Sequence, residues 1–197
     1  MSYYRFSASL VRMFLSPFYK IKKENTDVPS EGAFIGIANH VSYLDGIIMA
    51  STIKRPMRFV MYWKIYETPV LKLLFKSLNV IPIASPRENR EVYDKAVAEM
   101  DAEIKRGGAV FIFPEGMITY DGEMNEFKSG AVRLSQIHNC DVIPFGINGL
   151  WGSMYSRAKK RTTRLLRRNV IIKGGDVISH HKVKQKTLED EVALLIK

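Results

Sequence analysis

Short apolar runs alternate with longer amphipathic segments along most of this chain, and that alternation limits the folds open to it. The apolar runs, rich in Val, Ile and Phe, are typical of buried strands, and the segments between them repeat apolar residues every three or four positions, as helices do. Strands that alternate with helices predict an α/β layer fold, in which helices flank a central β-sheet. We expect strands at 33–38, 57–62, 80–84, 109–114, 142–147 and 169–174, and helices at 4–18, 43–53, 64–77, 89–106, 128–138 and 187–196.

Two polar clusters follow two of the expected strands. His40 and Asp45 come after the strand at 33–38, and the segment Phe-Pro-Glu-Gly at 113–116 ends the strand at 109–114. Junctions between strands and helices are where α/β proteins place chemistry. A carboxylate five residues after a histidine can accept one ring N–H and leave the other nitrogen free to take a proton from a substrate hydroxyl. His40 and Asp45 are therefore the candidate catalytic pair.

The order of these motifs resembles that of the glycerolipid acyltransferases, the superfamily of the lysophosphatidic-acid acyltransferases. In that family the first block reads N-H-x-S-x-x-D, the third has F-P-E-G followed by D-G and F-K-x-G-A, and the fourth has V-I-P. This chain has those letters in the same order at residues 39–45, 113–116, 121–122, 127–131 and 142–144. The agreement of several spaced motifs is far more specific than a single His-x4-Asp pair.

The resemblance implies an O-acyltransferase that moves a fatty acyl group from a thioester, acyl-CoA or acyl carrier protein, to the free hydroxyl of a lysophospholipid. In this reading His40 is the general base, and Asp45 holds the ring tautomer and stabilises the imidazolium. The resemblance implies no cofactor beyond the acyl donor and no metal.

Further site residues follow from the same blocks. A lysine near an expected helix start, where backbone amides also face anions, suits a phosphate. Backbone amides after His40 or around Gly116 are the alternatives for stabilising the tetrahedral oxyanion. We expect acceptor binding by Glu115, Gly116, Thr119, Lys128 and Arg87, and oxyanion or site-shaping roles for Asn39, Ser42 and Pro114.

Two departures from the family pattern bear on the acceptor. The family often has Thr-Arg-Ser after its F-P-E-G, whereas residues 117–119 are Met-Ile-Thr, and the usual I-P-x-D-R block is replaced here by Ile-Pro-Ile-Ala-Ser-Pro-Arg at 81–87. Losing these phosphate ligands favours a headgroup-bearing acceptor, as in the acyltransferase module of lysophosphatidylethanolamine acyltransferases. The alternative is a 1-acylglycerol-3-phosphate acyltransferase, with Arg87 or Arg90 in place of the missing cations.

Charge and amphipathicity predict contact with a membrane. The formal net charge is +10, and much of the excess lies at 157–168. The segment 4–18 repeats Phe or Leu every four residues between arginines, as interfacial helices do. We therefore expect a peripheral protein on the cytoplasmic face of an anionic membrane. No nucleic-acid-binding motif accompanies the basic residues, so nucleic acid is not an expected partner.

The length of 197 residues and a hydrophobic content of 46% fit one compact core. We expect a single acyltransferase domain, with 1–25 as an amphipathic membrane-contact segment and 26–197 as the catalytic α/β core.

The sequence also bears on other classes of function. The single cysteine, Cys140, excludes an intramolecular disulfide and cysteine-cluster metal sites, and no Gly-x-Ser-x-Gly elbow indicates a serine hydrolase. A non-catalytic module that binds a lysolipid in the same groove is the alternative from another class. Intact His40, Asp45 and Glu115 argue against it.

Overall fold

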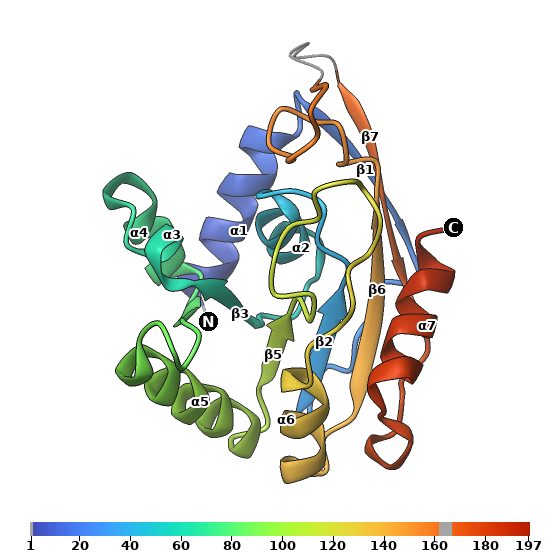
Figure 1. Ribbon diagram of the computed structural model, residues 1–197. Helices are drawn as coiled ribbons and strands as arrows, with labels where there is room; N and C mark the ends of the chain where they lie inside the picture. Colours follow the sequence, from blue (N-terminus) through green and yellow to red (C-terminus); the bar gives the residue numbers. More distant parts are fainter. Residues whose placement is uncertain (1, 162–166) are drawn as a thin grey trace.

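The computed structural model describes residues 2–161 and 167–197, and its centre is a seven-stranded sheet in the order β1-β7-β6-β2-β5-β3-β4 (Figure 1). Strands β2 to β6 run parallel to one another, while β7 is antiparallel to β6 and pairs in parallel with β1 at one edge. The strands are β1 (Tyr19–Glu24), β2 (Phe34–Ala38), β3 (Arg58–Tyr62), β4 (Ile81–Ile83), β5 (Ala109–Ile112), β6 (Val142–Asn148) and β7 (Arg168–Gly174).

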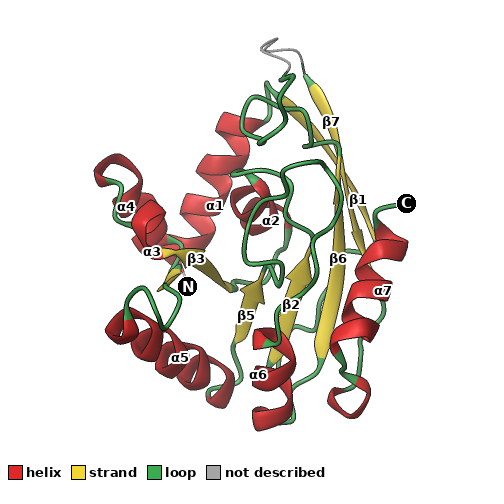
Figure 2. Ribbon diagram, viewed as in Figure 1, coloured by secondary structure: helices red, strands yellow, loops and turns green. Residues whose placement is uncertain are grey.

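Helices cover both faces of the sheet (Figure 2). One hydrophobic core packs α1, α2 and α4 against one face, and a second packs α5, α6 and α7 against the other. Strand β2 serves both cores: Phe34 and Ala38 belong to the first, and Ile35 and Ile37 to the second, because side chains alternate between the two faces of a strand. The helices are α1 (Ser2–Leu15), α2 (Asp45–Thr52), α3 (Trp63–Tyr66), α4 (Pro69–Ser77), α5 (Arg90–Lys105), α6 (Gly130–His138) and α7 (Gln185–Leu195), with a 3₁₀ turn at His180–Lys182.

Proline accounts for two differences from the predicted helices. The helix predicted at 64–77 is two helices, α3 and α4, because Thr68 is extended before Pro69, the first residue of α4. The helix predicted at 4–18 ends at Leu15, two residues before Pro17. The other predicted helices and all the predicted strands are confirmed to within a few residues.

Strand β1 was not predicted. Its sequence, Tyr-Lys-Ile-Lys-Lys-Glu, has too few apolar residues for a buried strand, but β1 lies at the edge of the sheet, where one side of the strand faces solvent. Its register with β7 is continuous from Tyr19↔Arg168 to Glu24↔Lys173. The boundary expected at residue 25 is therefore misplaced, because residues 19–24 belong to the α/β core.

The sheet places the two polar clusters together. Strands β2 and β5 are parallel neighbours, with Ile37 opposite Ile112. The chain leaves both strands at the same edge of the sheet, so His40 and the segment 113–116 meet there, as expected for ligand sites in parallel sheets.

Candidate active site

The turn between β2 and α2 holds His40 against Asp45. Asp45 Oδ2 lies 2.8 Å from His40 Nδ1, and it also accepts the backbone N–H groups of Val41 at 2.7 Å and Ser42 at 2.8 Å. Asp45 is fully buried. Burial raises the pKa of its carboxyl group, and the hydrogen bonds from His40, Ser42 and Val41 oppose that rise. The three donors fix the carboxylate, which in turn fixes the imidazole.

The His40 ring is oriented from a second side by Phe113. The two rings stack with centroids 4.3 Å apart and an interplanar angle of 18°. Because Nδ1 faces Asp45, the nitrogen left for a substrate is Nε2. The His40 side chain is 21% exposed, enough for a reactant to reach it. Sequence reasoning did not assign a role to Phe113, although it belongs to the F-P-E-G block.

Glu115 is a clamp. Its Oε1 accepts the His40 backbone N–H at 2.6 Å, and its Oε2 accepts both the backbone and the side-chain N–H of Asn125, each at 2.8 Å. Glu115 is 2% exposed, and burial raises the pKa of its carboxyl group, opposed by those hydrogen bonds. The direct acceptor contact expected for Glu115 is thus replaced by an internal one that ties the His40 backbone to the loop after β5.

Thr119 also faces inward. Its backbone N–H donates to His40 O at 3.0 Å, and its hydroxyl donates to Asp121 Oδ1 at 2.8 Å. Thr119 is fully buried, so the expected contact of this side chain with an acceptor is not supported. Like Glu115, it fixes the backbone of His40.

Gly116 and Lys128 lie together on the exposed side of the same loop. The backbone of Lys128 donates to Pro114 O at 2.8 Å, which brings its side chain over Gly116. Gly116 has a φ of +67°, and a Cβ there would lie 2.6 Å from Lys128 Nζ. The structure therefore places the Lys128 ammonium beside the turn that starts at Gly116. Pro114 itself is buried and shapes this loop.

Asn39 and Ser42 shape the site from behind. The Asn39 side chain donates to Ile147 O at 3.0 Å and accepts the Ile147 N–H at 2.8 Å, so it joins the end of β2 to β6. The Ser42 hydroxyl donates to Tyr155 O at 3.2 Å and accepts the Leu44 N–H at 3.2 Å. Both side chains are buried. They support the turn, and neither side chain is free to hold an oxyanion.

Of the two groups of amides considered for the oxyanion, those after His40 are occupied. The N–H groups of Val41 and Ser42 both donate to Asp45, and the His40 N–H donates to Glu115. In the turn after β5, the Met117 and Ile118 N–H groups donate to no acceptor within the described part of the chain. The turn at 116–118 is therefore the better candidate.

Arg87 is not part of this cluster. It lies in the exposed turn after β4, and β4 is separated from β2 by β3 and β5. Three strand spacings amount to about 14 Å. The structure gives no contact between Arg87 and the residues around His40.

Arg157 is a site residue that the sequence reasoning missed. Its guanidinium donates to Ile118 O at 3.4 Å, lies 4.6 Å from the centre of the Tyr120 ring, and reaches the Tyr43 hydroxyl at 3.5 Å. The bridge between Ser42 and Ser156 brings this distant segment to the turn. Arg157 had been counted only as part of the basic stretch 157–168, of which residues 162–166 lie outside the described residues.

The described residues contain neither a metal-ligand cluster nor a helix that could span a membrane. No group of three or more His, Cys, Asp or Glu side chains in residues 2–161 and 167–197 is placed to hold a metal ion. Within the same residues, no helix has the length and apolar character needed to span a bilayer.

Comparison with known proteins agrees with the geometry. The chloroplast 1-acyl-sn-glycerol-3-phosphate acyltransferases of Arabidopsis thaliana and Brassica napus are each 28% identical over 137 residues, or 68% of this chain and 37% and 38% of theirs. The chain thus spans well under half the length of these relatives. The crystal structure of the 1-acyl-sn-glycerophosphate acyltransferase of Thermotoga maritima has the same fold, with a TM-score of 0.77 at 18% identity, covering 98% of this chain and 78% of that one. Residues 20–148 match the acyltransferase family. The chain therefore belongs to the acyltransferase family.

Proposed function

We propose that this protein transfers a fatty acyl group from an acyl thioester to the free hydroxyl of a lysophospholipid, with a 1-acylglycerol 3-phosphate as the acceptor. The observation on which this rests is the His40–Asp45 pair, whose free Nε2 lies at the same edge of the sheet as a turn flanked by Lys128 and Arg157. A base, amides for an oxyanion and cations for a phosphate are the groups that this reaction needs.

His40 acts as the general base. Nε2 takes the proton of the acceptor hydroxyl as its oxygen attacks the thioester carbonyl, and Asp45 stabilises the imidazolium that forms. The tetrahedral intermediate collapses with loss of the thiolate, which receives the proton back from His40. The products are the ester and a free thiol, so one proton leaves the hydroxyl and one reaches the sulfur.

The oxyanion of that intermediate is held by the backbone amides of Met117 and Ile118. Neither N–H has an acceptor among the described residues, and both belong to the turn that Thr119 fixes to His40. Preorganised donors of this kind typically contribute a factor of about 10² to 10³ to the rate.

A phosphomonoester is the acceptor that the two cations favour. The lack of an arginine at residues 117–119 favoured a headgroup-bearing lysolipid. Arg157 supplies a guanidinium to the same turn from a distant segment, with Lys128 on the turn's exposed side. Arginine and lysine together suit a phosphate with two charges. The relatives named above are 1-acylglycerol-3-phosphate acyltransferases, and lysophosphatidylethanolamine becomes the competing acceptor in the test.

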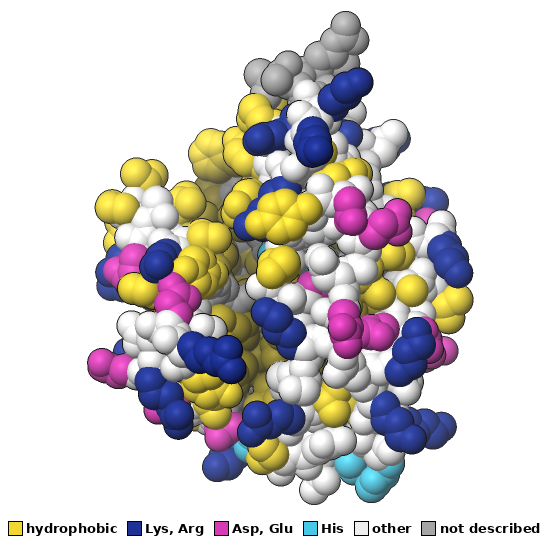
Figure 3. All heavy atoms as spheres, in the orientation of Figure 1, with side chains coloured by type: hydrophobic (Ala, Val, Ile, Leu, Met, Phe, Trp, Pro, Cys, Tyr) yellow, Lys and Arg dark blue, Asp and Glu magenta, His cyan; other side chains and the backbone are white. Residues whose placement is uncertain are grey.

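The acyl chain has an apolar surface beside the site. Figure 3 shows a hollow lined by hydrophobic side chains between the α3–α5 side of the molecule and its centre. The net charge of +10 attracts both acyl-CoA and an acidic acyl carrier protein, so either serves as the donor.

The protein approaches its substrates from an anionic membrane surface, at its cytoplasmic face. Helix α1 buries Tyr4 and Val11 and exposes a different, apolar face; α4, which contacts α1, also exposes apolar residues. These side chains suit insertion among lipid headgroups. The exposed residues are Tyr3, Phe6, Met13 and Phe14 on α1, and Val70, Leu71 and Leu73 on α4.

The proposal is tested by thiol release from palmitoyl-CoA with 1-acylglycerol 3-phosphate or lysophosphatidylethanolamine on anionic vesicles. The wild type is compared with His40→Ala and with His138→Ala, which removes another histidine paired with an aspartate, Asp101, at 2.8 Å. We expect His40→Ala to lose at least about 10³-fold in rate, and His138→Ala to keep the wild-type rate.

Each component of the proposal has its own contrary result. An equal loss of the rate of thiol release in the two histidine variants excludes His40 as the specific base. Faster transfer to lysophosphatidylethanolamine reverses the choice of acceptor. Wild type that binds lysolipid but releases no thiol with acyl-CoA or acyl carrier protein is a binding module.

A further inference from the structure

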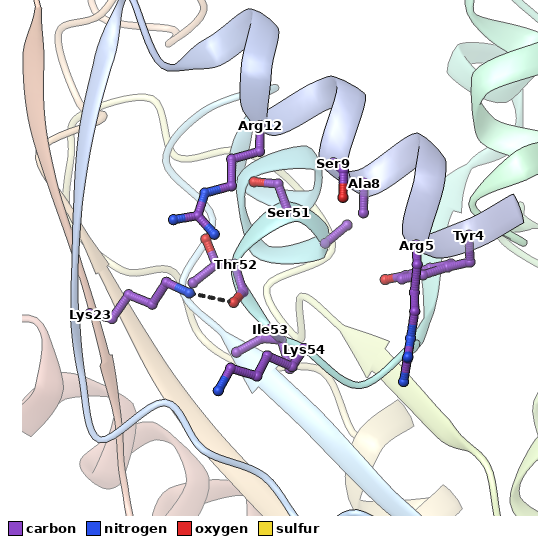
Figure 4. A pocket seen from close by; sticks show the side chains of 11 residues that line it. Tyr4, Arg5, Ala8, Ser9, Arg12, Lys23, Ser51, Thr52, Ile53 and Lys54 are labelled. Atoms are coloured by element: carbon purple, nitrogen blue, oxygen red, sulfur yellow. Dashed lines mark hydrogen bonds between the residues drawn. The ribbon is translucent and has the colours of Figure 1, made fainter. Parts of the chain in front are cut away.

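A pocket lies between α1, the end of α2 and β1 (Figure 4). Its volume is about 380 Å³, within the range of pockets that hold small ligands. Four cations line it, with two serine hydroxyls between them. These residues are Arg5, Ser9, Arg12, Lys23, Ser51 and Lys54.

The pocket is separate from the candidate active site. Helix α2 starts at Asp45, beside His40, and ends at Thr52, which lines the pocket. Eight helical residues span about 12 Å. Strand β1 runs opposite to β2, so its last residues, including Lys23, lie at the edge of the sheet away from His40. None of the groups assigned to acyl transfer lines the pocket.

Three of the cations converge in the pocket. Lys23 Nζ donates to Thr52 O at 2.9 Å, and Figure 4 shows the Arg12 guanidinium on one side of this ammonium and Lys54 on the other. Partial burial, Arg12 and Lys54 all lower the pKa of Lys23, and Asp27 opposes them. The Lys23 ammonium therefore lies among like charges.

These positive charges are not balanced by ion pairs. Lys22 pairs with Glu24 at 2.9 Å, and Lys186 pairs with Asp190 at 2.9 Å. By contrast, the four cations of the pocket form no ion pair with a carboxylate in residues 2–161 or 167–197. Like charges held together without direct ion pairs lower stability, and an anion bound between them reduces that repulsion.

We propose that this pocket binds a doubly charged phosphate group, that is, a phosphomonoester. A guanidinium offers two parallel donors to phosphate oxygens, ammonium groups add charge, and the hydroxyl of Ser9 donates to a remaining oxygen. The phosphate belongs either to a lipid headgroup or to a soluble molecule such as CoA. Helix α1 lines the pocket and also carries the exposed apolar side chains proposed to contact the membrane, which favours the lipid headgroup.

The test compares two variants with equal loss of charge. Arg12→Gln/Lys54→Gln removes two cations of the pocket and keeps Lys23, whose bond to Thr52 supports the fold. Lys20→Gln/Lys22→Gln removes two exposed cations from β1, outside the pocket. Binding is measured on phosphatidylcholine vesicles containing phosphatidic acid or, at matched surface charge, phosphatidylglycerol. Calorimetry with inorganic phosphate and with CoA provides the soluble arm.

We expect the wild type and the β1 variant to prefer phosphatidic acid, and the pocket variant to bind it at least about tenfold more weakly and to lose the preference. If the phosphate is soluble, the pocket variant instead loses binding of phosphate or CoA while its vesicle binding stays unchanged. Equal behaviour of the two double variants in every arm overturns the proposal.

Two further measurements distinguish the pocket from the acyl-transfer site. The pocket variant is expected to keep the wild-type rate of thiol release with detergent-dispersed substrates. Arg157→Gln is expected to keep the preference for phosphatidic acid vesicles. Failure of acyl transfer would thus leave the phosphate pocket standing, and loss of the vesicle preference in Arg157→Gln would assign that preference to the active site instead.

Discussion

Glu115 accepts the backbone N–H of His40 at 2.6 Å through one carboxylate oxygen and both N–H groups of Asn125 through the other. One buried carboxylate thus joins the proposed base to the loop at Asn125, which lies ten residues after Glu115. Its geometry makes Glu115 a positioning residue, which acts on the reaction through the placement of His40.

Glu115→Gln is expected to lower kcat by about 10- to 100-fold and to leave the KM for the lysolipid within twofold. An amide presents an N–H toward either His40 or Asn125, where the carboxylate accepts, and the free energy of unfolding falls by about 1–3 kcal/mol. Steady-state kinetics and urea denaturation measure both. The exposed Glu123→Gln is the control. A raised KM with unchanged kcat would instead make Glu115 an acceptor ligand.

Asp45→Asn is expected to lower kcat by roughly 10²- to 10⁴-fold, because a neutral amide does not stabilise the imidazolium of His40. It also weakens the fold. Oδ1 is buried without a partner in the described chain, so the new amide nitrogen either lacks an acceptor there or faces the N–H groups of Val41 and Ser42. Asp101→Asn, at the other His–Asp pair, is the matched control in single-turnover assays. A loss below tenfold for Asp45→Asn would contradict the general-base mechanism.

Arg157→Gln is expected to raise the KM for 1-acylglycerol 3-phosphate by about 10- to 100-fold, the effect of losing a charge-assisted hydrogen bond. The KM for lysophosphatidylethanolamine should rise less, because its phosphodiester has a single negative charge. Arg87→Gln is the control, since Arg87 is exposed and lies beyond two intervening strands. The reverse ranking of the two arginines would restore Arg87 as the phosphate ligand.

Burial raises the pKa of the Cys140 thiol from 9.0 to about 11. The unfolded chain therefore ionises first as the pH rises, and the stabilising effect of keeping the thiol neutral is complete below pH 9 and lost between pH 9 and 11. The slope is about 1.4 kcal/mol per pH unit, or roughly 3 kcal/mol over that interval. Urea denaturation of wild type and Cys140→Ala at several pH values measures it. If the free energies of unfolding of the two proteins changed in parallel with pH, burial would not shift the pKa of the Cys140 thiol.

The buried elements could be predicted from sequence because burial leaves a periodic signal. Strand β2 is buried on both faces and reads as a continuous apolar run, and the predicted catalytic pair follows it directly. Strand β1 was missed because it is an edge strand made mostly of charged residues. Arg157 was missed because only the backbone pairing of Ser42 with Ser156, between segments far apart in sequence, brings it to the turn. The roles of Glu115 and Thr119 depend on burial, which their motif does not reveal.

The pairing of β1 with β7 also sets the order in which this molecule is completed. Tyr19 pairs opposite Arg168, so during synthesis β1 waits for almost all of the intervening chain before it can join the sheet. Contacts between such distant segments form late, because closing a long loop must precede them. Until then α1, several of whose aromatic side chains are exposed, is held to the growing domain mainly by the packing of its own buried residues. Under the proposal that α1 contacts lipid, a nascent chain in that state presents this helix to the bilayer before its fold is complete.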